Sequence, residues 1–193
     1  LMRIIDHLIC IGTNLVDIGA LTNFWLTFNK RELAYDVLDK LCGARLTNSY
    51  GRIGGLYRDL YDGATQDILH VVKECEEAID EVEKLIRKNQ IFIGRSKDVC
   101  VFSAEQALSY GFTGPCLRAS GVDWDLRKAT PYWGYEQYDF EVPVGTVGDT
   151  WDRIMLRFYE VRESAKIIRQ AIKTLPGGPV NVSDPRISLP EKK

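Results

Sequence analysis

Apolar residues that recur every three or four positions run through most of this sequence, and they restrict the chain to a fold built from long helices. The longest run opens at Asp149 and Thr150 and keeps one apolar face for about six or seven turns of 3.6 residues. It stops at 175–179, where prolines and glycines cluster. Shorter runs with the same spacing start at Leu1, Phe24 and Thr65. We therefore predict a mainly α protein with a core of about four long helices.

The boundaries of these helices follow from local signals. The first run has no N-cap and starts with Leu rather than Met, so we expect the sequence to begin inside a helix of a longer protein. The second is expected to bend or break near Phe28–Asn29 and to end at Gly43 as a C-cap. For the third we expect Thr65 as the cap, a heptad-like apolar seam, and an end at 91–94.

Long ordered loops and a minor β element complete the predicted fold. Residues 111–132 combine three glycines and two prolines with aromatic and alternating charged residues, which predicts an ordered strap without helical or strand periodicity. Ser103 and Gln106 form a capping box for a short helix before it. After it, 138–144 alternates like a short strand, which Pro143 limits to an edge. The strap can equally close the core or line a site.

Composition narrows the possible functions. The 193 residues are 45% hydrophobic and 27% charged, enough for one sizeable core, which we assign to 1–180, with 181–193 as an extended tail or linker. A formal charge of −2 with interleaved acids and bases argues against nucleic acid as a partner. No apolar run is long enough to cross a bilayer. The five scattered cysteines lack the spacing of a metal site and favour a reducing compartment.

The first helix carries a polar stripe beside its apolar one. Asp6, Cys10, Thr13 and Asp17 are separated by four, three and four residues, so they share one face. A carboxylate at Asp17 among apolar neighbours could mark a proton-handling site, or it could bond local backbone at the end of the helix. Burial of Asp17 facing an open groove would favour a site, whereas exposure would favour a scaffold. His7 is expected to be a satisfied core residue.

Four motifs identify a family. They are DIGALTNFW at 17–25, GARLTNSYGRIGG at 43–55, FTGPCLRASGVDWDLRKATPY at 112–132 and VGDTWDR at 147–153. Together they resemble the 49 kDa-type (D-type) subunit of NADH-quinone oxidoreductase (respiratory complex I), in order and spacing, over essentially the whole chain. The same fold resembles the large subunit of [NiFe] hydrogenases, and a hydrogenase-like complex is the rival interpretation. The metal-binding cysteine pairs of that subunit would lie outside this sequence.

The resemblance implies a role in a membrane-associated enzyme. It implies a peripheral subunit on the cytoplasmic side of a bacterial inner membrane, with no cofactor of its own. Its neighbours would be the small iron–sulfur (B-type) subunit, the C-type subunit and the H-type membrane subunit that forms the quinone channel. Electrons would arrive from a [4Fe–4S] cluster in the neighbouring subunit, with quinone as the substrate of the complex. The family's quinone-binding Tyr and His lie upstream of Leu1, so the isolated chain is not expected to be active.

Individual residues can be matched to the family's pattern. Asp17 matches the Asp that pairs with the quinone-binding His, and Thr13, one turn earlier, would line the same chamber. Arg45, Arg52, Arg118 and Arg127 match positions that we assign to structure or to contacts between subunits. Thr47 stands where mitochondrial members have a His, so no proton uptake by that His can be transferred to this chain.

Overall fold

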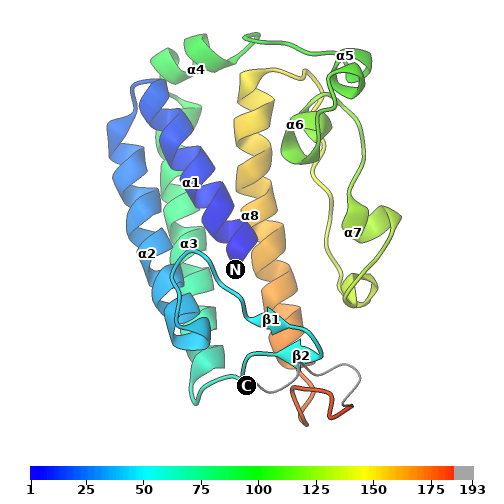
Figure 1. Cartoon of the computed structure of the whole chain (residues 1–193). Helices are drawn as coiled ribbons and strands as arrows, with labels where there is room; N and C mark the ends of the chain where they lie inside the picture. The colour runs from blue at the N-terminus through cyan, green and yellow to red at the C-terminus, as the bar shows by residue number, and fades with distance from the viewer. Residues whose placement is uncertain (185–193) are drawn as a thin grey trace, which may run out of the picture.

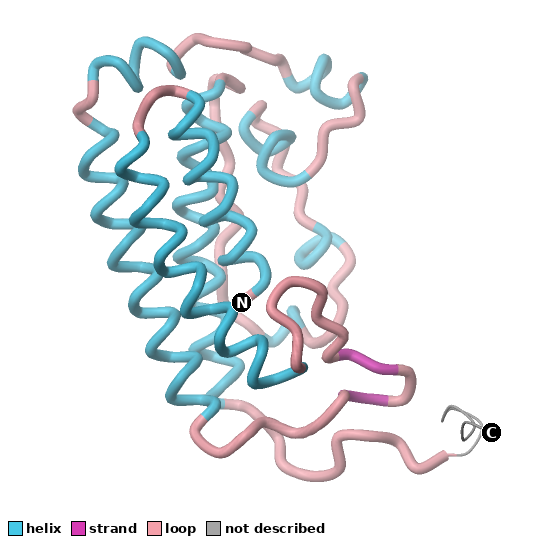
Figure 2. Tube along the Cα trace, turned by 60° about the vertical axis from the view of Figure 1, so that its left-hand side comes forward, coloured by secondary structure: helices cyan, strands magenta, loops and turns pink. Residues whose placement is uncertain are grey.

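The computed structural model describes residues 1–184, and four long helices dominate it (Figure 1). They are α1 (Met2–Asp17), α2 (Leu21–Cys42), α3 (Ala64–Arg87) and α8 (Thr150–Lys173). The helices lie side by side as a bundle, as both Figure 1 and the turned view of Figure 2 show. The predicted mainly α architecture with about four long helices is therefore confirmed. A likeness to the hydrogenase fold stays a prediction.

The core lies where the apolar stripes of these four helices meet. Helix α1 contributes residues that are fully buried, among them Ile4, Leu8 and Ile11, and α3 contributes its heptad seam. Gly12 lets α1 and α2 approach closely, because a Cβ at this position would lie 2.5 Å from the Thr27 hydroxyl. None of the helices within residues 1–184 combines the length and the apolarity needed to cross a bilayer.

Several predicted boundaries need correction. Helix α2 is continuous through Phe28, since that ring packs on α1 and stacks on Phe24 instead of interrupting the helix. Gly63, with a φ of 87°, precedes α3, so Thr65 lies inside the helix and does not cap it. The segment expected to end α3 instead forms α4 (Gln90–Ser96), which the Asn89 side chain caps. Gly43 does end α2, in the left-handed conformation with a φ of 74°.

The strap at 111–132 is ordered, but the prediction that it lacks secondary structure was wrong. It contains α6 (Gly114–Ala119) and α7 (Leu126–Ala129). The two helices have only six and four residues, and each starts at a local signal, Pro115 in α6 and the Asp125 cap in α7, which periodicity over a longer window does not detect. Helix α5 (Ala104–Ser109) precedes the strap with the expected capping box, and a 3₁₀ turn, η1 (Tyr135–Gln137), follows it.

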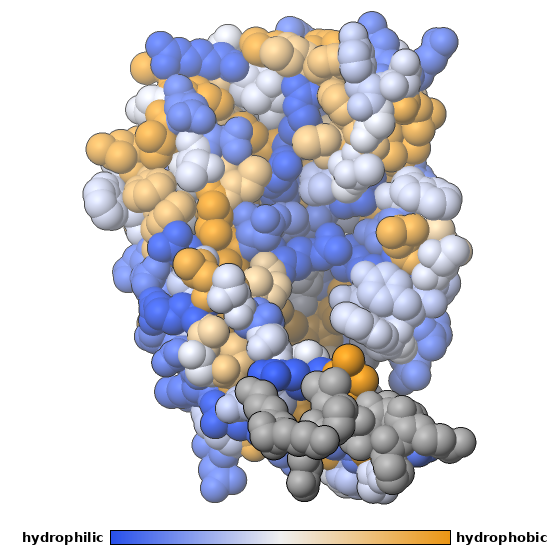
Figure 3. Space-filling model, viewed as in Figure 1, coloured by the Kyte–Doolittle hydropathy of each residue, from blue (hydrophilic) through white to orange (hydrophobic). Residues whose placement is uncertain are grey.

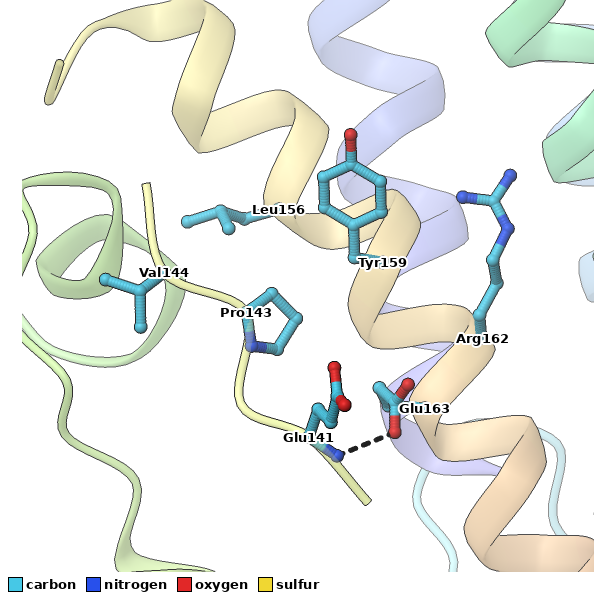
Figure 4. A pocket seen from close by; sticks show the side chains of 7 residues that line it. All are labelled: Glu141, Pro143, Val144, Leu156, Tyr159, Arg162 and Glu163. Atoms are coloured by element: carbon cyan, nitrogen blue, oxygen red, sulfur yellow. Dashed lines mark hydrogen bonds between the residues drawn. The ribbon is translucent and has the colours of Figure 1, made fainter. Parts of the chain in front are cut away.

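The expected strand at 138–144 is absent, and the reason is visible beside α8 (Figure 4). The backbone amide of Glu141 donates to the Glu163 carboxylate at 2.8 Å. Gln170 accepts from the amide of Asp139 at 2.8 Å and donates to its carbonyl at 2.7 Å. Side chains of a helix thus satisfy the backbone groups that a partner strand would otherwise have paired.

The β structure of the described residues lies elsewhere, in a small hairpin. Strands β1 (Gly51–Arg52) and β2 (Gly55–Leu56) pair antiparallel. The chain after α8 returns to this hairpin: the amide of Leu56 donates to the Val180 carbonyl and that of Val182 to the Gly54 carbonyl. The division into 1–180 and a tail at 181–193 stays a prediction, and 185–193 lie outside the described residues.

Candidate functional site

The polar stripe of α1 is present and faces solvent. Asp6, Thr13 and Asp17 are exposed and Cys10 is half-buried. The Thr13 hydroxyl donates to the carbonyl of Ile9 at 2.9 Å, a bond within the helix that leaves its lone pairs accessible. The structure therefore keeps Thr13 and Asp17, which are four residues apart, on one open face at the end of α1.

The exposure of Asp17 favours a scaffold role by the criterion given above, which required burial beside a groove for a site. Its side chain is exposed, as a scaffold role would require. However, it makes no hydrogen bond or ion pair within residues 1–184, and the end of α1 is closed by backbone bonds from Gly19 to Val16 and from Ala20 to Leu15. The local capping bond on which the structural alternative depended is not formed.

A second polar cluster is buried between α1, α8 and the strap. Its centre is Glu160 on α8, which is 1% exposed. Glu160 accepts from His7 Nε2 at 2.7 Å and from the guanidinium of Arg118, and the Arg3 guanidinium lies 3.5 Å away. Burial alone would raise the pKa of Glu160, but the bond from His7 and the charge of Arg118 outweigh it and lower the pKa from 4.5 to about 2.

The strap supplies the other half of this buried cluster. Asp125 caps α7 by accepting from the amide of Arg127 at 2.9 Å, and it also accepts from the Arg127 guanidinium at 2.7 Å. Burial opposes ionisation of both groups, yet their mutual bonds lower the pKa of Asp125 and raise that of Arg127. Arg118 connects the two halves, because it donates to the Trp124 carbonyl at 3.0 Å and lies 3.8 Å from Asp125.

A cavity of about 200 Å³ opens beside the buried cluster. Arg3, Arg118 and Arg127 line it, together with the more exposed side chains of Trp124 and Tyr132. In Figure 3 the face that carries the cluster is hollowed between the bundle and the strap, with hydrophilic side chains along the hollow. A deprotonated Glu160 is not a proton donor near neutral pH, so the chemistry of this cluster is charge pairing and positioning.

Of the four arginines that we assigned to structure or to contacts between subunits, two are buried and two are exposed. Arg118 and Arg127 are 3% exposed and belong to the buried cluster. Arg45 is exposed and pairs with Glu32 and with Asp36 on α2. Arg52, also exposed, donates to the carbonyl of Ser49 at 2.8 Å and lies over the ring of Tyr57.

Sequence reasoning missed Glu160. The available signal was a second stripe on α8, in which Leu156, Glu160, Ser164 and Ile167 follow at steps of four, four and three residues, and all four are buried. His7 was expected to be a satisfied core residue, and its Nε2 is bonded as expected, while Nδ1 has no hydrogen-bond partner in the described part. No group of three His, Cys, Asp or Glu side chains within residues 1–184 is arranged to hold a metal ion.

Comparison with known proteins identifies the family. Residues 17–193 match the family described as the 49 kDa subunit of the respiratory-chain NADH dehydrogenase. The chain belongs to this family. The matched region includes Asp17 and the whole strap at 111–132, whereas Arg3, His7 and Thr13 lie before its start.

Several relatives cover the chain almost completely. It is 52% identical over 193 residues to the C/D-type subunit of NADH-quinone oxidoreductase of Bdellovibrio bacteriovorus, covering 100% of this chain and 34% of that protein. It is 50% identical over 190 residues to the D-type subunit of Methylacidiphilum infernorum, covering 98% and 46%. It is 46% identical over 192 residues to the D-type subunit of Myxococcus xanthus, covering 100% and 46%. The chain thus spans between about a third and a half of these relatives' length.

Proposed function

We propose that this chain is part of a peripheral-arm subunit of NADH-quinone oxidoreductase and that the end of α1 lines the chamber in which quinone is reduced. The observation that carries the proposal is the match of residues 17–193, which begins at Asp17, to the 49 kDa family. Asp17 is exposed, which in this chain alone favours a scaffold, but its carboxylate has no partner in the described residues. In the relatives, more than half of the protein lies outside the matched region and can cover this face.

Quinone reduction requires a proton donor, and a carboxylate such as Asp17 can support one. Two electrons and two protons convert a quinone to a quinol, so a proton donor must lie next to the quinone oxygen. A carboxylate beside an imidazole favours the protonated ring and so prepares it as a donor. Asp17 would fill this role toward a His supplied from outside this sequence, and Thr13 would line the same wall. The electrons would come from a [4Fe–4S] cluster held by a neighbouring subunit.

The apolar part of a quinone needs apolar walls, and the adjoining end of α2 offers them. Phe24 and Phe28 stack with ring centroids 3.8 Å apart, and with Trp25 they line an open cavity of about 590 Å³. Trp25 is 65% exposed and its ring contacts that of Phe24, so the three aromatic side chains form a contiguous apolar patch of the kind that marks a binding surface. Phe28 lies against α1 beside Gly12, close in sequence to Thr13. This surface supports an apolar ligand or partner at the same end of the helix pair.

Replacement of Asp17 by Asn in the full-length subunit tests the proposal. We expect quinone reductase activity of the assembled complex to fall by about tenfold or more, because the amide cannot hold an imidazolium. Electron entry from NADH to an artificial acceptor should stay unchanged. Asp39→Asn is a matched control, since Asp39 is an exposed helical aspartate near the other end of α2. Unaltered quinone turnover with Asp17→Asn would return Asp17 to a structural role.

The partners and the location of the complex follow from the same proposal. The chain would contact the small iron–sulfur (B-type) subunit, the C-type subunit and the H-type membrane subunit, on the cytoplasmic side of a bacterial inner membrane. The relatives named above are all subunits of quinone-linked enzymes, which favours this interpretation over a hydrogenase-like complex.

A further inference from the structure

The pocket beside the buried cluster contains more positive than negative charge. Three guanidinium groups, those of Arg3, Arg118 and Arg127, line the cavity, and they face two carboxylates, Asp125 and Glu160. Both carboxylates are buried and stay ionised, because their bonds to the arginines and to a histidine lower their pKa values. The pocket therefore keeps an excess of positive charge near neutral pH.

One guanidinium group that lines the pocket has accessible donors left, that of Arg3, whose side chain is 36% exposed. Arg118 is 3% exposed, and its Nε, which has no hydrogen-bond partner in the described residues, is buried out of reach of an incoming group. Within residues 1–184, Arg3 approaches the Glu160 carboxylate at 3.5 Å, which is longer than a good hydrogen bond. An additional acceptor of negative charge would complete this pocket.

The mouth of the pocket has the composition of a protein-binding hot spot. Trp124, Leu126 and Tyr132 line it and are between 42% and 56% exposed. Next to Tyr132, Trp133 is 92% exposed and has a φ of 51°, a left-handed backbone that a bulky residue adopts only at a cost. Trp, Tyr and Arg dominate binding energy at protein interfaces. Exposed aromatic side chains and a left-handed backbone at Trp133 do not stabilise the chain unless a partner covers them.

We propose that this pocket receives the side-chain carboxylate of an Asp or Glu from a neighbouring subunit. An acidic side chain supplies an acceptor for Arg3, whose side chain is 36% exposed, and the negative charge that the pocket needs, while the flanking segment of the partner covers Trp124, Trp133 and Tyr132. A lipid surface is a weaker fit, because anionic lipids are recognised by clusters of exposed Lys and Arg, whereas two of these arginines are buried.

The proposed docking site is separate from the proposed quinone chamber. Arg3 and Asp17 lie near opposite ends of α1, roughly 21 Å apart along the helix axis at 1.5 Å per residue. The inference rests on the proposed function only in that it needs the chain to be one subunit of an assembly. It assigns no role in catalysis to the pocket.

Carbodiimide coupling tests the proposal in the purified assembly with the full-length subunit. Leu126→Lys places an amine at the mouth of the pocket, where carbodiimide can join it to a carboxylate in contact with it. Leu108→Lys is the matched control, because Leu108 is 59% exposed on α5 and Leu126 is 56% exposed. The unsubstituted chain, which carries Lys128 nearby, sets the background.

We expect Leu126→Lys to give at least about tenfold more of an amide to one Asp or Glu of another subunit than either control, as identified by mass spectrometry. Leu126→Glu should repel that carboxylate and weaken the association of the subunit by about tenfold or more, whereas Leu108→Glu should not. An assembled, quinone-active complex without an intersubunit amide from Leu126→Lys would overturn the pocket proposal alone. An amide to a protein outside the oxidoreductase would support the pocket and contradict the proposed function.

Discussion

At the scale of single residues, Glu160 shows how a buried charge can hold two distant segments together. It lies on α8, and its partners come from α1 and from the strap, so one carboxylate joins three parts of the chain. Taking a carboxylate out of water is costly unless opposite charges and donors surround it, and His7 and Arg118 provide both. Removing the charge of Glu160 would leave Arg118 buried without its strongest partner.

We predict that Glu160→Gln lowers the free energy of unfolding by about 3–5 kcal/mol, because the buried Arg118 loses its closest carboxylate and keeps only Asp125, 3.8 Å away. The loss should depend on pH. Since the folded-state pKa of Glu160 is about 2 and its ordinary value is 4.5, its stabilising effect is complete above about pH 4.5 and is lost as pH falls toward 2. The difference between the two proteins should therefore shrink over that range.

Urea denaturation at pH 7 and at several pH values below 4.5 measures both effects. Glu77→Gln serves as the control, because Glu77 is 59% exposed and lies 3.7 Å from Lys73, a surface pair that contributes less than about 1 kcal/mol. Equal stability of Glu160→Gln and the original chain at pH 7 would show that the buried cluster does not hold the strap to the bundle.

At the scale of elements, the close approach of α1 and α2 depends on a glycine. A Cβ at Gly12 would lie 2.5 Å from Thr27 Oγ1 and 2.9 Å from the ring of Phe28, both on α2. Neither helix can move away easily, because α1 also packs on α8 through its fully buried face. In Figure 1 α1 lies between α2 and α8, as this packing requires.

We predict that Gly12→Ala destabilises the chain by about 1–3 kcal/mol through overpacking, although alanine is the better helix former. Gly94→Ala is the matched control, since Gly94 also lies within a helix, α4, and a Cβ there would meet no atom within 4 Å. That control should be neutral or stabilise by up to about 1 kcal/mol. The result would be contradicted if both substitutions shifted the urea midpoint equally.

At the scale of the whole molecule, the sequence predicted what depends on local signals. Helical periodicity and capping residues such as Asp149 are encoded within a few turns, so the four long helices could be predicted. The pairing of His7 with Glu160 could not be predicted, because the two residues are 153 positions apart and no sequence pattern indicates that they are in contact. The alternation of 138–144 predicts a strand, but it does not reveal that side chains of α8 form hydrogen bonds with the backbone of this segment.

In the candidate site, too, local spacing could be predicted from the sequence, whereas contacts between distant segments could not. Thr13 and Asp17 could be placed on one face from their spacing alone, and the structure places them there. The role of Asp17 came from the resemblance of its motif to the 49 kDa-type subunit, and it stays a proposal. The pocket formed by Arg3 and the strap required the fold, because its charges come from segments more than a hundred residues apart.

Labelling of the assembled complex with a photoreactive quinone tests whether the end of α1 lines the quinone chamber. We expect the label to attach to the peptide that contains Thr13 and Asp17, and an excess of unlabelled quinone to prevent this attachment. Labelling that blocks quinone reduction while leaving this peptide unmodified would contradict the claim that the end of α1 lines the chamber.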